Sequence, residues 1–171
     1  MRKNIITPRL TLRPMADTDA DAVIGILIHP QVTATYMIPD LPTREEQMAL
    51  FERFKTLTHD ESRFVYGIDL GGRIIGFLND VDRGEDWIEV GYVIHPDHWN
   101  CGYAAEALGA AVELLFAHGF SAVRAGAFEE NPASLRVMEK CGMIRQDHTD
   151  EIEYRGITHT CIYYAAARGS Q

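Results

Sequence analysis

The sequence contains little cysteine and no long apolar run. Its three cysteines, Cys101, Cys141 and Cys161, are odd in number and form no CxxC pair, which disfavours both a disulfide framework and a zinc site. No stretch approaches the apolar length that crosses a bilayer, and the basic N-terminal residues are not followed by the apolar region of a secretory signal. We therefore expect a cytoplasmic protein without a membrane partner.

Positive charge is also scarce. The chain has 16 Lys and Arg residues against 25 Asp and Glu residues, a formal net charge of -9. This charge would repel a phosphate backbone, and no basic cluster with interleaved aromatic residues is present, so we expect no nucleic-acid partner. GxGxxG and Walker sequences are absent, which excludes the usual nucleotide-binding motifs. A cationic amine, in contrast, would be attracted.

The composition is that of an ordinary globular domain. Hydrophobic residues make up 46% and charged residues 24% of the 171 residues, a balance that argues against disorder. A chain of this length can bury a substantial core. We expect one domain over residues 1–168 and a frayed tail over residues 169–171.

The first third of the chain combines strand and helix patterns. Apolar and polar residues alternate over 9–13, which predicts a strand. Asp17 is then expected to cap a helix that ends before His29-Pro30, and residues 30–42 are typical of a loop. Thr43-Arg44-Glu45-Glu46 has the form of a capping box and predicts the start of a second helix.

The central third is rich in β-branched and aromatic residues. Three such runs, residues 63–69, 73–79 and 87–94, predict an antiparallel meander. Apolar residues then recur at helical spacing over 102–118, and the run 122–128 predicts another strand. Because a helix joins them, the strands at 87–94 and 122–128 are expected to be parallel, with a right-handed crossover.

The last third predicts one more helix and a hairpin. Asn131-Pro132 places a capping residue before a proline and opens a helix that ends at Cys141-Gly142. Residues 143–165 then indicate two strands with a turn near Tyr154-Arg155-Gly156. No internal repeat or low-complexity linker interrupts this order of elements.

The turn after the strand at 87–94 is the most informative stretch. It opens the longest helix and contains Gly102 and the small residues Ala104 and Ala105. The first N–H groups of a helix have no partners within the helix and carry the positive end of its dipole, so a diphosphate can bind there without a lysine. The alternative is a plain connection between a strand and a helix, where glycine is also common.

This turn resembles a motif of the GNAT N-acetyltransferase superfamily. Trp99-Asn100-Cys101-Gly102-Tyr103-Ala104 is similar to the Gln/Arg-x-x-Gly-x-Gly/Ala turn of that superfamily. The leading Trp is similar to the RimJ/RimL-like branch, which modifies protein N-termini and some small amines, although that branch usually has glycine in place of Asn100. Further resemblance spans nearly the whole chain, at Arg9–Pro14, Glu89–Ile94, Asn131–Ser134 and Glu139–Met143.

The resemblance implies a fold and a reaction. The fold would be α+β, a three-layer α/β arrangement with a twisted, mixed and mostly antiparallel sheet of six to seven strands, helices on both faces and one parallel strand-helix-strand unit. Acetyl-CoA would be the co-substrate, without a metal. The acceptor would be the amine of a small molecule or a peptide N-terminus, and the protein would be a monomer or a homodimer.

The resemblance also implies which residues bind acetyl-CoA. Main-chain groups where the parallel strands splay would hold the pantetheine arm, the turn would hold the diphosphate, and Asn131 would reach the pantetheine. Arg136 or Lys140 would meet the adenosine end, unless they belong to a solvated helix face. The complete expected set is Val93, Ile94, His95, Trp99, Asn100, Cys101, Gly102, Tyr103, Ala104, Ala105, Asn131 and Ser134.

Two residues are the candidates for catalysis. Glu89 lies mid-strand and could accept the proton of the attacking ammonium group, or it could be a structural carboxylate paired across the sheet. By the resemblance to the RimL-like branch, the Ser134 hydroxyl would lie near the sulfur and hydrogen-bond or protonate the departing thiolate, or it could be a hydroxyl at a helix start. The tyrosine acid of many superfamily members is replaced by Met138. Glu151 and Glu153 are the second choices for the base.

Other functions stay open at this stage. A non-catalytic acyl-CoA-binding sensor or degenerate family member would keep the cofactor cleft without turnover. The loop 30–42 and the final hairpin are expected to border the amine. His95-Pro96-Asp97-His98 could suggest a metal site, but no helical HExxH frame supports it. Cys101 could be a nucleophile activated by the helix start, although a plain turn residue is favoured.

Overall fold

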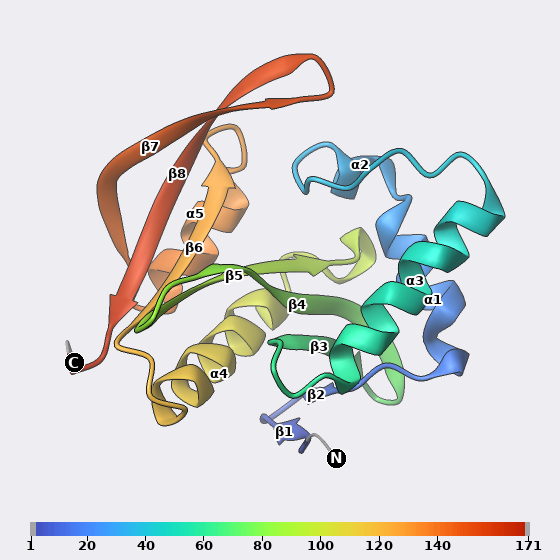
Figure 1. Cartoon of the computed structure of the whole chain (residues 1–171), viewed down its shortest axis with the longest axis horizontal. Coiled ribbons are helices and arrows are strands. Elements are labelled where there is room, and N and C mark those ends of the chain that lie inside the picture. Colours follow the sequence, from blue (N-terminus) through green and yellow to red (C-terminus); the bar gives the residue numbers. More distant parts are fainter. Residues whose placement is uncertain (1–2, 170–171) are drawn as a thin grey trace. The chain divides into compact units, whose positions relative to one another are not determined.

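The computed structural model describes residues 3–169 (Figure 1). By its contacts the chain divides into two compact units: unit 1 comprises residues 1–79 and 92–107, and unit 2 comprises residues 80–91 and 108–171. The chain passes from one unit to the other within β4 (Arg73–Arg83), β5 (Trp87–Ile94) and α4 (Tyr103–Ala117). A single domain over residues 1–168 stays a prediction, and residues 170–171 of the expected tail lie outside the described residues.

Unit 1 contains the N-terminal strands and the first three helices. Besides its parts of β4, β5 and α4, its elements are β1 (Ile5–Ile6), β2 (Thr11–Arg13), the 3-10 turn η1 (Asp17–Asp19), α1 (Ala20–Leu27), α2 (Pro30–Thr33), α3 (Arg44–His59), β3 (Val65–Leu70) and the 3-10 turn η2 (Pro96–His98). Strands β1 to β4 pair antiparallel in chain order. The predicted antiparallel pairing of the runs 63–69 and 73–79 is therefore confirmed.

The core of unit 1 lies between helices α1 and α3 and strand β4. Four apolar residues of α1 are buried, namely Val23, Ile24, Ile26 and Leu27, and Phe51 of α3 and Phe77 of β4 are inaccessible. The Phe77 ring packs against that of Phe54 in a tilted arrangement, with ring centroids 4.8 Å apart. The capping box of α3 is confirmed, because the Glu46 N–H donates to the Thr43 hydroxyl while the Thr43 N–H donates to the Glu46 carboxylate.

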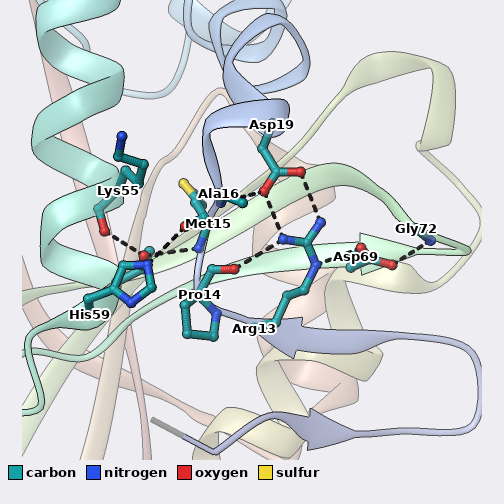
Figure 2. A network of polar contacts seen from close by, with 10 residues as sticks. Arg13, Pro14, Met15, Ala16, Asp19, Lys55, His59, Asp69 and Gly72 are labelled. Carbon is teal, nitrogen blue, oxygen red and sulfur yellow. Dashed lines mark hydrogen bonds and ion pairs between the residues drawn. The ribbon is translucent and has the colours of Figure 1, made fainter. Parts of the chain in front are cut away.

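An arginine network ties β2 to α1 and β3 (Figure 2). Arg13 Nε donates to Asp69 Oδ2 at 2.7 Å, and Arg13 Nη1 donates to Asp19 Oδ2 at 2.7 Å. Asp19 also accepts the main-chain N–H of Ala16 at 2.8 Å. The prediction that Asp17 caps the helix is therefore wrong: a 3-10 turn precedes α1, the N-cap position of α1 is Asp19, and Asp17 pairs with Lys55 instead.

The same network fixes the end of α3. The main-chain N–H of Met15 donates to the Thr58 hydroxyl at 3.0 Å, and that hydroxyl donates to the Lys55 carbonyl at 2.6 Å. A ring nitrogen of His59 lies 3.0 Å from the Met15 carbonyl. Figure 2 shows these contacts beside Arg13. The segment between β2 and α1 is therefore bound both by the arginine network and by residues at the end of α3.

Three further boundaries differ from the sequence prediction. The strand expected over 9–13 covers only Thr11–Arg13, because Leu10 closes a small turn with Thr7 through hydrogen bonds between the two residues. The loop expected over 30–42 begins with the short helix α2, which Pro30 opens and the His29 ring caps. Strand β4 continues to Arg83, beyond the predicted end at residue 79.

Unit 2 holds the parallel pair and the C-terminal hairpin. Its further elements are β6 (Ala122–Phe128), α5 (Pro132–Lys140), β7 (Ile144–Tyr154) and β8 (Ile157–Ala167). Strand β5 pairs parallel with β6 from Trp87 opposite Ala122 to Glu89 opposite Arg124. Strands β7 and β8 form the long hairpin visible in Figure 1, whose turn residues Arg155 and Gly156 have φ values of 53° and 76°. Such left-handed pairs suit a two-residue hairpin turn.

Within residues 3–169 the strands form one eight-stranded sheet in the order β1-β2-β3-β4-β5-β6-β8-β7. The mixed, mostly antiparallel α+β fold with one parallel pair is confirmed. The expected number of six to seven strands is wrong, because Ile5 and Ile6 form a strand of 2 residues that is too short to give a periodic pattern. The placement of helices on both faces stays a prediction. No helix within the described residues is long and apolar enough to span a membrane.

Candidate active site

The connection from β5 to α4 in unit 1 contains two residues with left-handed backbone conformation. After η2, Asn100 has a φ of 59° and Gly102 has a φ of 80°. Asparagine is one of the few residues besides glycine that enter this region at modest cost. Asn100, at the position where the RimJ/RimL-like branch usually has glycine, therefore adopts a backbone conformation that glycine favours.

Trp99 and His95 fix the start of this turn. The indole N–H of Trp99 donates to the Ile94 carbonyl at 2.7 Å, which links the two ends of η2. The main-chain N–H of His95 donates to the Ile75 carbonyl at 2.8 Å. That main-chain groups of Val93, Ile94 and His95 hold the pantetheine stays a prediction. The main-chain N–H of His95 takes no part in it, because this group already donates to Ile75.

The residues just before α4 are exposed. Hydrogen bonding within the helix starts where the Glu106 N–H donates to the Gly102 carbonyl at 3.1 Å. Asn100, Cys101 and Gly102 are exposed, and Ala104 beyond them carries only a methyl group. Since helix N-termini carry partial positive charge on their N–H groups, small exposed residues at this place leave room for a phosphate group.

Arg9, from the segment before β2, lies over this turn. Its Nη1 donates to the Cys101 carbonyl at 2.8 Å, and its Nε donates to Glu106 Oε2 at 2.6 Å. The guanidinium carbon lies 4.6 Å from the centre of the Tyr103 ring. Sequence reasoning gave Arg9 no site role, and no local pattern could connect it to a residue 97 positions away.

Glu89 of β5 belongs to unit 2. It is half-buried, and Arg124 lies opposite it in the parallel register. Burial raises the pKa of Glu89 above its ordinary value, the negative charges of Asp82 and Asp150 raise it further, and Arg124 acts in the opposite direction. A carboxylate with a raised pKa is a stronger base, which suits proton transfer near neutral pH.

A second group of polar side chains in unit 2 lies on the hairpin. The Tyr163 hydroxyl donates to Asp150 Oδ2 at 3.0 Å, and His148 Nε2 lies 3.2 Å from Asp150 Oδ1. A Cβ at position 126 would lie 2.8 Å from the Tyr163 ring, so Gly126 leaves the space that this ring fills. Burial, together with Cys161 and Asp150, raises the pKa of Tyr163. The sequence pattern did not indicate this group, because it depends on strand register.

The sequence profile of the acetyltransferase (GNAT) domain matches residues 9–144. The chain belongs to this family. It is an acetyl-CoA-dependent N-acetyltransferase, and the RimJ/RimL-like resemblance is confirmed. Among its relatives, the Uncharacterized N-acetyltransferase YoaA of Bacillus subtilis (strain 168) is 28% identical over 157 residues, which cover 89% of each chain.

Solved structures share the GNAT fold over nearly the whole chain. The acetyltransferase (GNAT family) of Bacillus anthracis has a TM-score of 0.82 and 25% identity, covering 96% of this chain and 98% of that chain. RimL, the ribosomal L7/L12 α-N-protein acetyltransferase, solved with coenzyme A, has a TM-score of 0.81 and 17% identity over 99% and 100% of the two chains. Spermidine N-acetyltransferase of Vibrio cholerae, solved with CoA and spermine, has a TM-score of 0.79 and 17% identity over 94% and 96%.

Helix α5 of this acetyltransferase begins as the sequence predicted. The Asn131 side chain accepts the Ser134 N–H at 3.2 Å, and Pro132 occupies the first turn. Asn131 therefore has a capping role, and its reach to a pantetheine stays a prediction. Met138 has 0% of its surface exposed, so the position where many GNAT members carry a tyrosine acid belongs to the core here.

The remaining sequence candidates lie at the surface of unit 2. Arg136 and Lys140 are exposed on α5, which fits a solvated helix face. Glu151 and Glu153 are exposed on β7, where the Thr160 hydroxyl donates to Glu151 at 2.9 Å. Neither glutamate shares the half-buried environment of Glu89, which leaves Glu89 the stronger candidate for the base.

The two alternative chemistries at the turn receive no support from its geometry. Within residues 3–169 no group of three or more His, Cys, Asp or Glu side chains is arranged to hold a metal ion. The His95 ring instead accepts the Asp97 N–H at 3.2 Å as a helix cap. The exposed thiol of Cys101 donates to the Trp99 carbonyl at 3.3 Å, a contact within the turn.

Proposed function

We propose that this GNAT enzyme transfers the acetyl group of acetyl-CoA to a primary amine by direct attack in a ternary complex. The observation that carries the proposal is the turn of unit 1, in which Asn100 and Gly102 have left-handed φ values immediately before α4. The diphosphate is assigned to this turn, and the proton transfer is assigned to unit 2. Each assignment is supported by contacts within its own unit.

The residues at the turn fit a diphosphate. Main-chain N–H groups from Cys101 to Ala105 would bind it at the positive end of α4, and the side chains at Gly102 and Ala104 are too small to obstruct it. A diphosphate held by main-chain groups needs no lysine nearby. This agrees with the small share of basic residues in a chain of net charge -9.

Glu89 is the proposed base. Acetyl-CoA supplies a thioester carbonyl, and the attacking amine must lose its ammonium proton as the C–N bond forms and the C–S bond breaks. The half-buried Glu89, whose pKa is raised by burial and by Asp82 and Asp150, would hold that proton. Ser134 at the start of α5 would donate a hydrogen bond to the sulfur that leaves.

The acceptor class is a primary amine, either a small molecule or a peptide N-terminus. Spermidine N-acetyltransferase and the α-N-protein acetyltransferase RimL have this fold and represent these two classes by name. The carboxylates of Asp82, Glu89 and Asp150 favour a cation on this part of unit 2. We propose that they concentrate the ammonium form of the acceptor, from which Glu89 removes the proton.

The test is release of free CoA from acetyl-CoA with a panel of peptides, polyamines, amino acids and aminoglycosides, with the acetylated product identified by mass. Glu89→Gln should lower kcat by about 10²- to 10⁴-fold, the usual contribution of a general base, and leave acetyl-CoA affinity nearly unchanged. Glu151→Gln, the matched control on β7, should change neither. The rate of the wild type should rise with pH as Glu89 loses its proton, and this rise should be absent in Glu89→Gln.

Three results would contradict the proposal or part of it. If acetyl-CoA binds but no acceptor releases CoA, the non-catalytic sensor considered from the sequence would explain this chain better than amine acetylation. If Glu89→Gln loses acetyl-CoA binding in proportion to its loss of rate, Glu89 has a structural role. Ser134→Ala should lower turnover with cofactor affinity intact, and an unchanged kcat would remove Ser134 from the mechanism.

A further inference from the structure

We propose that Arg9 is a positioning residue for the diphosphate site, acting through Glu106 and the turn that precedes α4. The inference rests on the proposed function, because it assumes that the turn binds the diphosphate of acetyl-CoA. It gives a role to the first arginine of the Arg9–Pro14 motif, which the catalytic proposal leaves without one. All of the residues involved belong to unit 1.

Arg9 holds the turn by three kinds of contact. Its guanidinium donates to the Cys101 carbonyl at 2.8 Å, donates to Glu106 at 2.6 Å and lies over the Tyr103 ring at 4.6 Å. Its main-chain N–H donates to the second oxygen of Glu106 at 2.8 Å. Bidentate and charge-assisted contacts of this kind fix geometry more firmly than single neutral hydrogen bonds. The turn is therefore fastened to the segment before β2.

The negative charge of Glu106 explains why the contacts of Arg9 with the turn are needed. It lies in the first turn of α4, where a carboxylate is stabilised by the helix dipole but would repel a diphosphate bound at the same end. Burial would raise the pKa of Glu106, but hydrogen bonds from the Thr7 hydroxyl and from Arg9 lower it overall, so the carboxylate is charged. Arg9 supplies the compensating positive charge and directs both carboxylate oxygens toward itself.

Arg9 lies close to the proposed position of the diphosphate, and its role does not require a direct contact with it. Its side chain is 47% exposed, whereas that of Glu106 is 13% exposed. A Cβ at position 102 would lie 3.3 Å from Arg9 Nη2, so the glycine that permits the left-handed turn also leaves room for the guanidinium. Arg9, Gly102 and Glu106 together therefore set both the charge on the turn and its backbone conformation.

The experiment measures binding of acetyl-CoA and of acetyl-pantetheine, which lacks the diphosphate, to four proteins: wild type, Arg9→Met, Arg9→Lys, and Arg9→Met combined with Glu106→Gln. Arg9→Met should weaken acetyl-CoA binding by about tenfold, the size of a favourable charge interaction at a helix end, and leave acetyl-pantetheine binding unchanged. Arg9→Lys should lie between, because it keeps the charge without the planar fork. The double variant should recover most of the affinity lost in Arg9→Met, because the unpaired carboxylate is removed.

Each contrary result has a separate meaning. Equal weakening of both ligands in Arg9→Met, or a double variant no tighter than Arg9→Met, would overturn the positioning role through Glu106. Unchanged acetyl-CoA binding in Arg9→Met would overturn it as well, while the proposed function stands if the wild type still prefers acetyl-CoA. A wild type that binds the two ligands equally would overturn the diphosphate site itself. The unfolding midpoint of each variant checks that it is folded.

Discussion

Two arginines four positions apart in one sequence motif have opposite surroundings. Arg13 is 21% exposed and contacts Asp19 and Asp69, whose side chains are 7% and 9% exposed. Arg9 is 47% exposed and contacts one carboxylate at an open turn. Removing a charge from a buried group leaves its partners unpaired in a poorly solvated place, whereas water can replace an exposed partner. We therefore expect Arg13 to determine stability and Arg9 to determine ligand affinity.

The largest expected effect is that of Arg13→Met. It would leave two buried carboxylates without their partner, so the free energy of unfolding should fall by about 3–5 kcal/mol, the typical cost of breaking a buried ion pair. Urea unfolding followed by circular dichroism measures it. A loss below about 1 kcal/mol, the usual value for exposed pairs, would remove the contrast between the two arginines.

Asp19→Asn tests the same network from the other side. Burial would raise the pKa of Asp19, but hydrogen bonds from Arg13 and from the Ala16 N–H lower it below the ordinary 3.8. The substitution should cost about 1.5–3 kcal/mol at neutral pH, the range for hydrogen bonds to charged groups.

The pH dependence gives the sign of this contribution. Because the folded-state pKa of Asp19 is lowered, its stabilisation is fully present above the ordinary pKa of 3.8 and is lost as the pH falls through the lower folded value. Unfolding curves of the wild type between pH 7 and pH 2 should therefore show a steeper loss of stability at acid pH than those of Asp19→Asn. Parallel curves would contradict the assigned role of Asp19.

Arg9→Met should change stability much less. Its ion pair with Glu106 is partly solvated, so the free energy of unfolding should change by less than about 1 kcal/mol. Measured in the same urea series, this variant is the control for Arg13→Met. A loss as large as that of Arg13→Met would show that both arginines serve the fold, and the separation between them would fail.

The smallest expected effect is that of Asn100→Gly. Glycine adopts a φ of 59° without the steric cost that an L-residue carries, but it is more flexible when unfolded, so the two terms nearly cancel. Stability should change by less than about 1 kcal/mol and acetyl-CoA affinity by less than about twofold. Asn100→Val is the contrasting variant, because a β-branched residue resists this conformation, and it should weaken acetyl-CoA binding.

Much of the fold could be predicted because the sequence signals for its helices and strands are local. The Thr43 capping box, the Asn131-Pro132 helix start and the strand over 122–128 each depend on neighbouring residues, and each is confirmed. The contacts that the sequence did not reveal are long-range. Arg9 with Glu106 and Tyr163 with Asp150 come together only through the tertiary fold and the register of a hairpin.

Local rules also failed where two signals competed. Asp17 and Asp19 are both residue types that cap helices, and a 3-10 turn places Asp19, which also contacts Arg13, at the position directly before α1. For the site, the sequence indicated the turn as a candidate because small residues open the longest helix, and Glu89 because a carboxylate within an apolar strand needs a partner; both roles stay proposals. No local sequence pattern indicated that the guanidinium of Arg9 would lie beside the turn.

The indole contact at the turn has an experimental use. The sequence has 2 tryptophans, and they lie in different units: Trp99, 42% exposed, donates to the Ile94 carbonyl in unit 1, and Trp87 stacks on Arg124 in unit 2. Intrinsic fluorescence of Trp87→Phe would therefore report on the turn alone, and that of Trp99→Phe on unit 2. Ligand titrations followed in this way would separate optically the two parts of the molecule whose chemistry differs.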